Sequence, residues 1–134
     1  MRTAVLAGLA ACAVAGSGCF SSTGPDVSRK FLIHVEEMVA PAEADPGETI
    51  ALGFYGTIGT DLCHEFDRFV VTRSGSRYTV QVWGRHTGDT VCATAVAELN
   101  GVAYRLPPPH TGDVHVSVVR PDGTTLEKTI RIRG

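Results

Sequence analysis

The chain has 134 residues, of which 43% are hydrophobic and 19% charged, a composition that fits one globular domain and excludes a disordered polymer. Its formal net charge is −2, and no long run of one sign occurs. Nucleic-acid binding needs a concentrated basic surface, so we expect no nucleic acid among the partners.

The first eighteen residues have the pattern of an export signal. Met1-Arg2 supplies a positive start, and residues 3–18 contain no charge and consist mostly of Ala, Val, Leu and Gly. As a helix this stretch would reach roughly 24 Å, which is less than the hydrocarbon core of about 30 Å that a permanent anchor must cross. We therefore predict that residues 1–18 are a signal peptide and exclude them from the fold.

Three small residues, Gly16-Ser17-Gly18, precede Cys19. This run resembles the lipobox of bacterial lipoproteins, in which the cysteine is acylated and becomes the first mature residue. The resemblance implies an exported protein held at the cell membrane by a lipid on Cys19. Because Phe20 rather than Asp follows the cysteine, it also implies the outer membrane in an organism that has one. The polar, Gly- and Pro-containing residues 19–28 are predicted to form a flexible tether.

Two other processing sites remain open. Leu9-Ala10-Ala11-Cys12 carries the aliphatic residue usual in lipoboxes, but cleavage there leaves a signal of roughly 16 Å, too short to reach a membrane-embedded peptidase. Ordinary secretion would instead use Ala13-Val14-Ala15 as a small-x-small cleavage site. It would release a periplasmic or secreted soluble protein and leave Cys19 as an unpaired thiol.

Two cysteines remain for the mature domain. Once Cys12 is removed with the signal and Cys19 carries a lipid, Cys63 and Cys92 are left. An exported protein meets an oxidising compartment, where two such thiols usually pair, so we predict a disulfide between them. The rival interpretation is a metal site made by both cysteines and His64, although zinc sites usually use four ligands in closely spaced pairs.

Alternation of hydrophobic and polar residues dominates residues 29–134, and no window shows a helical stripe. The predicted strands cover residues 31–36, 48–54, 66–73, 77–83, 91–99, 102–106, 114–119 and 126–132. Residues 55–63 are predicted to form a loop. About seven to eight short strands predict an all-β, antiparallel β-sandwich, with a small β-barrel as the alternative.

Three turn signals separate predicted strands. Ser74-Gly75 is one, and Arg120-Pro121-Asp122-Gly123 is another, because proline fixes φ and glycine supplies a left-handed residue. Asn100-Gly101 is the strongest short hairpin signal, since both residues tolerate positive φ. We therefore predict hairpins at all three places.

Residues 46–54, Pro-Gly-Glu-Thr-Ile-Ala-Leu-Gly-Phe, resemble the second strand of bacterial immunoglobulin-like domains. The closing hairpin at residues 120–124 is similar to the final pair of strands in those domains. The resemblance implies an immunoglobulin-like sandwich over residues 29–134 and assigns no functional residue. The chain departs from antibody domains because Cys63 precedes the third strand and Trp83 ends a strand.

No constellation commits the sequence to a chemistry. The five histidines lie on different predicted strands and loops: His34, His64, His86, His110 and His115. Their spacing matches no recognised ligand pair, so we predict no metal and no cofactor. A copper or zinc site would require the fold to bring His64 and His86 together beside the disulfide. Neither a Gly-x-Ser-x-Gly motif nor a phosphate-binding glycine loop occurs, and we predict that the protein is not an enzyme.

Arginine and aromatic side chains gather on the middle strands, and such side chains dominate binding hot spots. The candidate partner surface comprises Arg77, Tyr78, Trp83, Tyr104 and Arg105. The alternative is a sheet face on which arginine stems cover apolar surface. The favoured hypothesis is a non-catalytic envelope module that binds another protein or a surface polymer. A small metal-binding lipoprotein is the alternative, and an enzyme ranks last.

Overall fold

The structure is a computed structural model that describes residues 29–134. The predicted signal peptide (1–18), the lipid site at Cys19 and the predicted tether (19–28) lie outside the described residues. Over residues 29–134 the chain forms nine strands and no helix, so the all-β prediction is confirmed. Within the same range, no helix is present that could span a membrane.

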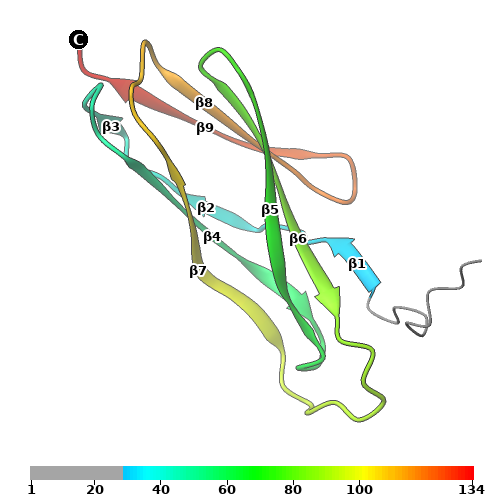
Figure 1. The fold of residues 1–134 in the computed structure, drawn as a ribbon. Helices are drawn as coiled ribbons and strands as arrows, with labels where there is room; N and C mark the ends of the chain where they lie inside the picture. Colours follow the sequence, from blue (N-terminus) through cyan, green and yellow to red (C-terminus); the bar gives the residue numbers. More distant parts are fainter. Residues whose placement is uncertain (1–28) are drawn as a thin grey trace, which may run out of the picture.

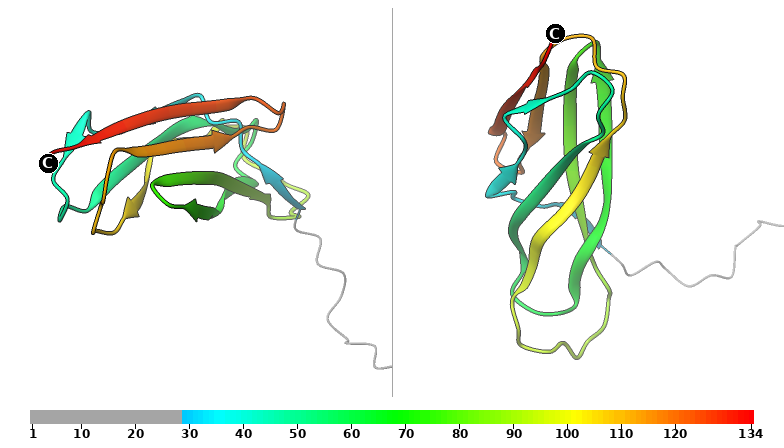
Figure 2. Two further views of the ribbon diagram at one scale, coloured as in Figure 1. Left: turned by 90° about the horizontal axis from the view of Figure 1, so that it is seen from above. Right: turned by 90° about the vertical axis from the view of Figure 1, so that its left-hand side faces the viewer.

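The strands form two sheets (Figure 1). In chain order they are β1 (Arg29–Leu32), β2 (Glu37–Val39), β3 (Glu43–Ala44), β4 (Ile50–Gly59), β5 (His64–Ser74), β6 (Arg77–His86), β7 (Ala97–Leu106), β8 (Val114–Val119) and β9 (Thr125–Ile132). The larger sheet has the order β1-β6-β8-β9-β3, with β5 also paired to β6, and the smaller sheet has the order β2-β4-β7. In the right-hand view of Figure 2, β4 and β7 lie in front of β5 and β6.

Alternate residues of both sheets point into the space between them. The largest side chains there that are less than 2% exposed are Phe54, Met38, Ile50, Leu52, Leu106, Ile130, Val35, Val80, Val82, Val114 and Val116. Most of them are β-branched or aromatic residues, the types that pack well on a pleated surface. The period-2 pattern of the sequence therefore marks the core correctly.

β6 organises the larger sheet. It pairs antiparallel with β5 along its length, and its other edge is shared by β1, which is antiparallel, and β8, which is parallel. The parallel contact arises because β7, in the opposite sheet, carries the chain back before β8 begins. A second parallel pair joins β3 and β9. The prediction of a wholly antiparallel fold is therefore wrong for these two pairs.

The predicted first strand is divided between the two sheets. β1 pairs with β6 in the larger sheet and β2 pairs with β4 in the smaller one. Between them, the Ile33 backbone N–H donates to the Val82 carbonyl (2.8 Å) and the Glu36 N–H donates to the Tyr55 carbonyl (2.9 Å). This segment connects the two sheets and places the start of β1, at Arg29, opposite His86 at the end of β6.

Two of the three predicted hairpins are present. β5 and β6 are joined through Gly75, whose φ is +62°, and β8 and β9 are joined through Gly123, whose φ is +84°. In the second turn, an Asp122 carboxylate oxygen accepts hydrogen bonds from the Thr124 hydroxyl (2.6 Å) and backbone N–H (2.9 Å). These bonds lower the pKa of Asp122 below its ordinary value.

The third hairpin prediction, at Asn100-Gly101, is wrong. β7 continues through both residues, and its pairing with β4 shifts there: Phe54 faces Val102 and Tyr55 faces Asn100, so Gly101 is an extra residue. Its φ of +75° is the left-handed conformation that glycine supplies in a β-bulge. Gly101 therefore adopts the positive φ that the sequence suggested, but in a β-bulge within β7 and not in a hairpin turn.

The loop boundaries also differ from the prediction. β4 continues to Gly59, through half of the predicted loop 55–63. Conversely, residues 87–96 form a loop where a strand was expected from Val91 onwards. Val91 is 89% exposed and Val96 is 56% exposed, so their hydrophobic character does not mark a buried strand face. This loop lies at one end of the two-sheet fold, and the C terminus lies at the other (Figure 2).

Candidate functional site

A disulfide joins two loops at the end of the fold where β4, β5 and β6 meet. Cys63 and Cys92 are bonded, with their Cα atoms 5.4 Å apart, as the sequence predicts. Backbone hydrogen bonds tie the same loops together, from Leu62 N–H to the Ala93 carbonyl (3.0 Å) and from Thr87 N–H to the Cys63 carbonyl (2.8 Å). We call this region, formed by residues 60–64 and 86–96, the disulfide end.

The fold brings His64 and His86 together beside the disulfide. The residues face each other across β5 and β6, and their ring centroids are 4.8 Å apart with the rings nearly perpendicular. A β-bulge at Asp67 sets this pairing, because the register shifts by one residue between Phe66 and Arg68. Without the bulge, the register of the β5–β6 hairpin would place Glu65 opposite His86.

The other three histidines lie elsewhere. His110 is buried, and its Nε2 is 2.8 Å from the Glu48 carbonyl, while His115 Nδ1 is 3.1 Å from the Thr129 hydroxyl. His34 is exposed on the segment between β1 and β2. Of the five histidines, only His64 and His86 therefore lie together beside the disulfide, which is the arrangement that a copper or zinc site would require.

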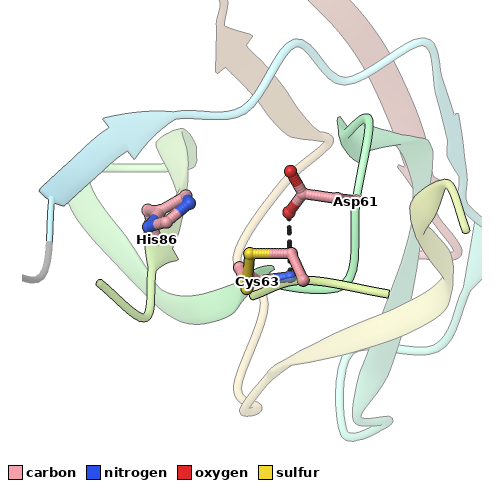
Figure 3. A group of neighbouring side chains, drawn as sticks. Asp61, Cys63 and His86 are labelled. Atoms are coloured by element: carbon pink, nitrogen blue, oxygen red, sulfur yellow. Dashed lines mark hydrogen bonds between the residues drawn. A yellow bond between two sulfur atoms is a disulfide. The ribbon is translucent and has the colours of Figure 1, made fainter. Parts of the chain in front are cut away.

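Asp61 orients His64. One carboxylate oxygen accepts hydrogen bonds from the Cys63 backbone N–H (2.9 Å) and from His64 Nδ1 (2.9 Å), and Figure 3 shows the first of these. With Nδ1 donating, neutral His64 keeps its lone pair on Nε2. Loss of water contact raises the pKa of Asp61, but these hydrogen bonds and the attraction of the positive charge that His64 and His86 carry when protonated outweigh it. The pKa of Asp61 therefore lies below its ordinary value.

We expect Asp61→Asn to remove a pH-dependent contribution to stability. Because the pKa of Asp61 is lower in the folded than in the unfolded chain, its ionised carboxylate stabilises the fold above the ordinary Asp range. That contribution is lost as pH falls through the folded-state pKa. In urea denaturation, wild type should exceed the variant in stability at pH 7, and the difference should shrink towards about pH 2. An equal difference at both pH values would contradict the assignment.

Two glycines make room for the rings at this end. Phe31, on β1, packs edge-on against His64, with ring centroids 5.8 Å apart. A Cβ on Gly84 would lie 2.8 Å from the Phe31 ring, and a Cβ on Gly59 would overlap the His64 ring. The positions of both rings therefore depend on glycine in the neighbouring strands.

We expect Gly84→Ala to displace Phe31 and to destabilise the protein by about 1–3 kcal/mol, the usual cost of overpacking a filled site. The backbone amides of β1 should also exchange with solvent faster. Urea denaturation and hydrogen exchange measure the two effects. Gly47→Ala is the matched control, because a Cβ at Gly47 meets nothing within 4 Å. Wild-type stability in Gly84→Ala would refute the packing argument.

A hollow of about 480 Å³ opens beside the histidine pair. Its lining residues are Arg29, Lys30, Phe31, His64, His86 and Gly88. Lys30 Nζ lies 3.4 Å from an Asp67 carboxylate oxygen, whereas Arg29 forms no ion pair with any acid of residues 29–134. Hydrogen-bond donors and positive charge on the walls suit a carboxylate or phosphate group.

The same end also holds groups that bind metals. Ligand atoms of Asp61, Cys63, His86 and Cys92 all lie within 4.8 Å of one another (Figure 3 shows the first three residues). The sulfurs are bonded to each other, and it is the thiolate that ligates metal, so of this group the oxidised protein offers only the Asp61 carboxylate and the His86 imidazole. His86 Nδ1 accepts a hydrogen bond from the Gly88 N–H (2.9 Å), an arrangement that a metal ion at this ring would disturb.

The structure does not gather the predicted partner surface on one face. That set was Arg77, Tyr78, Trp83, Tyr104 and Arg105. Tyr78 is only 4% exposed, and the guanidinium of Arg73 covers its ring at 5.3 Å. Tyr104 packs edge-on against Phe69 of the opposite sheet, with centroids 5.3 Å apart. Arg77 and Trp83 point outward from β6, and Arg105 belongs to β7 in the other sheet. These residues were chosen by residue type alone, and in the structure their side chains point to different faces of the two sheets.

The sequence did not identify Asp61 or Phe31 as parts of this site. Asp61 stands two residues before Cys63 and three before His64, a spacing at which an Asp side chain commonly caps a turn, so this signal was available. Phe31 carries no such signal, because its contact with His64 depends on how β1 pairs with β6.

The hollow and the paired histidines are the most distinctive features of the disulfide end. Their geometry comes from the start of β1, the bulge in β5 and the loops joined by the disulfide. No family model, curated protein or solved structure matches this chain.

Proposed function

We propose that the protein is a lipid-anchored, non-catalytic module of the cell envelope with an immunoglobulin-like sandwich fold. We further propose that it binds a surface polymer or partner protein by an anionic group held in the hollow at the disulfide end. The observation that carries this is the wall of the hollow, where Arg29 and Lys30 lie beside His64 and His86. The two facing sheets and the β8–β9 hairpin support the fold assignment.

Charge supports an anion as the ligand. Asp61 lies near the histidines, but its carboxylate is already engaged by the Cys63 N–H and by His64. Asp67 is engaged by Lys30. Arg29 pairs with no acid of residues 29–134, and its planar set of donors matches a carboxylate or phosphate in two parallel hydrogen bonds.

A calorimetric titration tests this proposal. The mature protein is titrated with envelope polymer fragments that carry phosphate or carboxylate groups. Arg29→Gln should weaken binding by about ten-fold or more, since a hydrogen bond to a charged group is worth about 1.5–3 kcal/mol. Arg77→Gln is the control: it removes the same charge from an exposed arginine at the other end of the larger sheet. Unchanged binding by Arg29→Gln, or equal weakening by both variants, would overturn the proposal.

The anchor has a separate test. Intact-mass spectrometry of the membrane fraction should find a diacylglycerol-sized adduct on the mature chain, and Cys19→Ser should eliminate it. A wild-type protein that begins at Gly16 and carries no adduct would show ordinary secretion instead.

A second candidate function is metal binding. It is favoured by the position of His64 and His86 beside Asp61, with the centroids of the two imidazole rings 4.8 Å apart. Titration of the purified protein with Cu²⁺ or Zn²⁺ should then show one tightly bound ion, lost in both His64→Ala and His86→Ala. His115→Ala is the control, because that ring lies on β8. A titration without a stoichiometric ion would remove this candidate.

A further inference from the structure

The loop between β6 and β7 carries an exposed, uncharged, mainly apolar segment. Residues 90–96 contain no charged side chain, and within them Val91 is 89% exposed and Val96 is 56% exposed. Leu62, 52% exposed, lies on the neighbouring loop, which the disulfide and the Leu62–Ala93 hydrogen bond hold against this segment. We call Leu62, Val91 and Val96 the apolar tip.

The apolar tip holds most of the exposed large hydrophobic side chains of the described residues. Only five large hydrophobic side chains of residues 29–134 are exposed, and three of them form the tip. The other two, Val39 and Tyr55, lie on the paired strands β2 and β4. Asp61 is the one charged residue of the loop segment 60–63, and its carboxylate is turned to the Cys63 N–H and His64. A gathered apolar patch of this kind marks an interaction surface.

The chain enters the domain at the same end. Arg29, the first described residue, faces His86, the last residue of β6, and β6 leads directly into the tip loop. The C terminus lies at the far end of the sandwich (Figure 1). From Cys19 to Arg29 the chain has ten residues, which reach at most about 36 Å when fully extended. A lipid on Cys19 would therefore hold the disulfide end, and not the C-terminal end, near the bilayer.

We propose that the apolar tip rests on the lipid bilayer, with Leu62, Val91 and Val96 inserted into its interfacial region. This inference rests on the lipid anchor of the proposed function. Three aliphatic side chains bury too little surface to hold a free protein on a membrane. A tethered protein needs only a weak contact, because the tether raises the effective concentration of the tip at the surface. The disulfide presents the two loops as one surface.

Fluorescence quenching tests the contact in the full-length, lipidated protein reconstituted into phosphatidylethanolamine–phosphatidylglycerol vesicles. A tryptophan is placed at the tip by Val91→Trp in a Trp83→Phe background. Its emission should shift to shorter wavelength and fall by about half or more when the lipid acyl chains are brominated. The control is Val39→Trp in the same background, an exposed valine of the smaller sheet, which should keep its emission.

The outcomes separate the two proposals. Protein that sediments with the vesicles while Val91→Trp is unquenched overturns the tip contact and leaves the anchor standing. Equal quenching at Val91 and Val39 also overturns it, because contact is then not confined to the tip. Protein that carries no lipid and does not sediment overturns the anchor and this inference together. Finally, Val91→Asp should sediment normally but abolish quenching of Val96→Trp, and persistent quenching would contradict the proposal.

Discussion

Replacing both Cys63 and Cys92 with alanine should lower the free energy of unfolding by about 3–4 kcal/mol. The bridge closes a loop with a sequence separation of 29, and the loss of chain entropy on closing such a loop gives this magnitude. The melting temperature should fall by more than about 10 °C, since about 4 °C or more accompanies each kcal/mol in a domain of this size. Urea denaturation and calorimetry under non-reducing conditions measure the two quantities.

Reduced wild-type protein is the control for this prediction. It loses the cross-link but keeps both sulfur atoms, including that of Cys63, which is only 4% exposed. Most of the destabilisation should therefore appear in the reduced wild type as well. If the double alanine variant unfolds at the wild-type urea concentration, the disulfide does not stabilise the fold.

Phe54→Ala should cost about 3–5 kcal/mol, the usual range for truncating a buried aromatic residue. Phe54 is fully buried in the middle of β4, and its ring lies 5.3 Å from that of Phe69 on the opposite sheet. Truncation leaves a cavity between the two sheets, lined by side chains that paired strands hold in place. Chemical denaturation measures the loss.

Tyr55→Ala is the matched control for Phe54. Tyr55 is the next residue of β4, points to the opposite face and is 36% exposed. Because its ring is partly solvated already, its truncation should cost less than half as much. Comparable losses for the two variants would show that the core does not lie on the Phe54 face.

The sequence predicts local structure here better than it predicts pairing. Alternation identifies the core positions of β4, β6 and β8, because the pleat alone decides which side chains share a face. It does not choose partners, and so the parallel contact of β6 with β8 was not foreseen. At Asn100-Gly101, the permissive backbone of glycine suits a turn and a bulge equally well, and only the presence of β4 alongside selects the bulge.

The candidate site was predictable only in part. The Cys63–Cys92 bond was predicted by counting the thiols left for the mature domain of a protein expected to be exported, which needs no knowledge of the fold. The contact between His64 and His86 depends on a one-residue shift at Asp67 in the middle of β5. No residue type near Asp67 indicates such a bulge. The sequence therefore predicts that a metal site would need His64 and His86 to lie together, but it cannot predict that they do.

The short strand at the entrance of the domain has a mechanical consequence. β1 is joined to β6 over Arg29 to Leu32, and inter-strand hydrogen bonds in an antiparallel pair run across the strand direction. Tension along the chain ahead of Arg29, directed along the strand, would load these bonds together in shear instead of opening them one after another. Phe31, wedged over Gly84, would resist the same sliding. A pull on the first strand would thus be transmitted to β6, which pairs with three strands of the larger sheet.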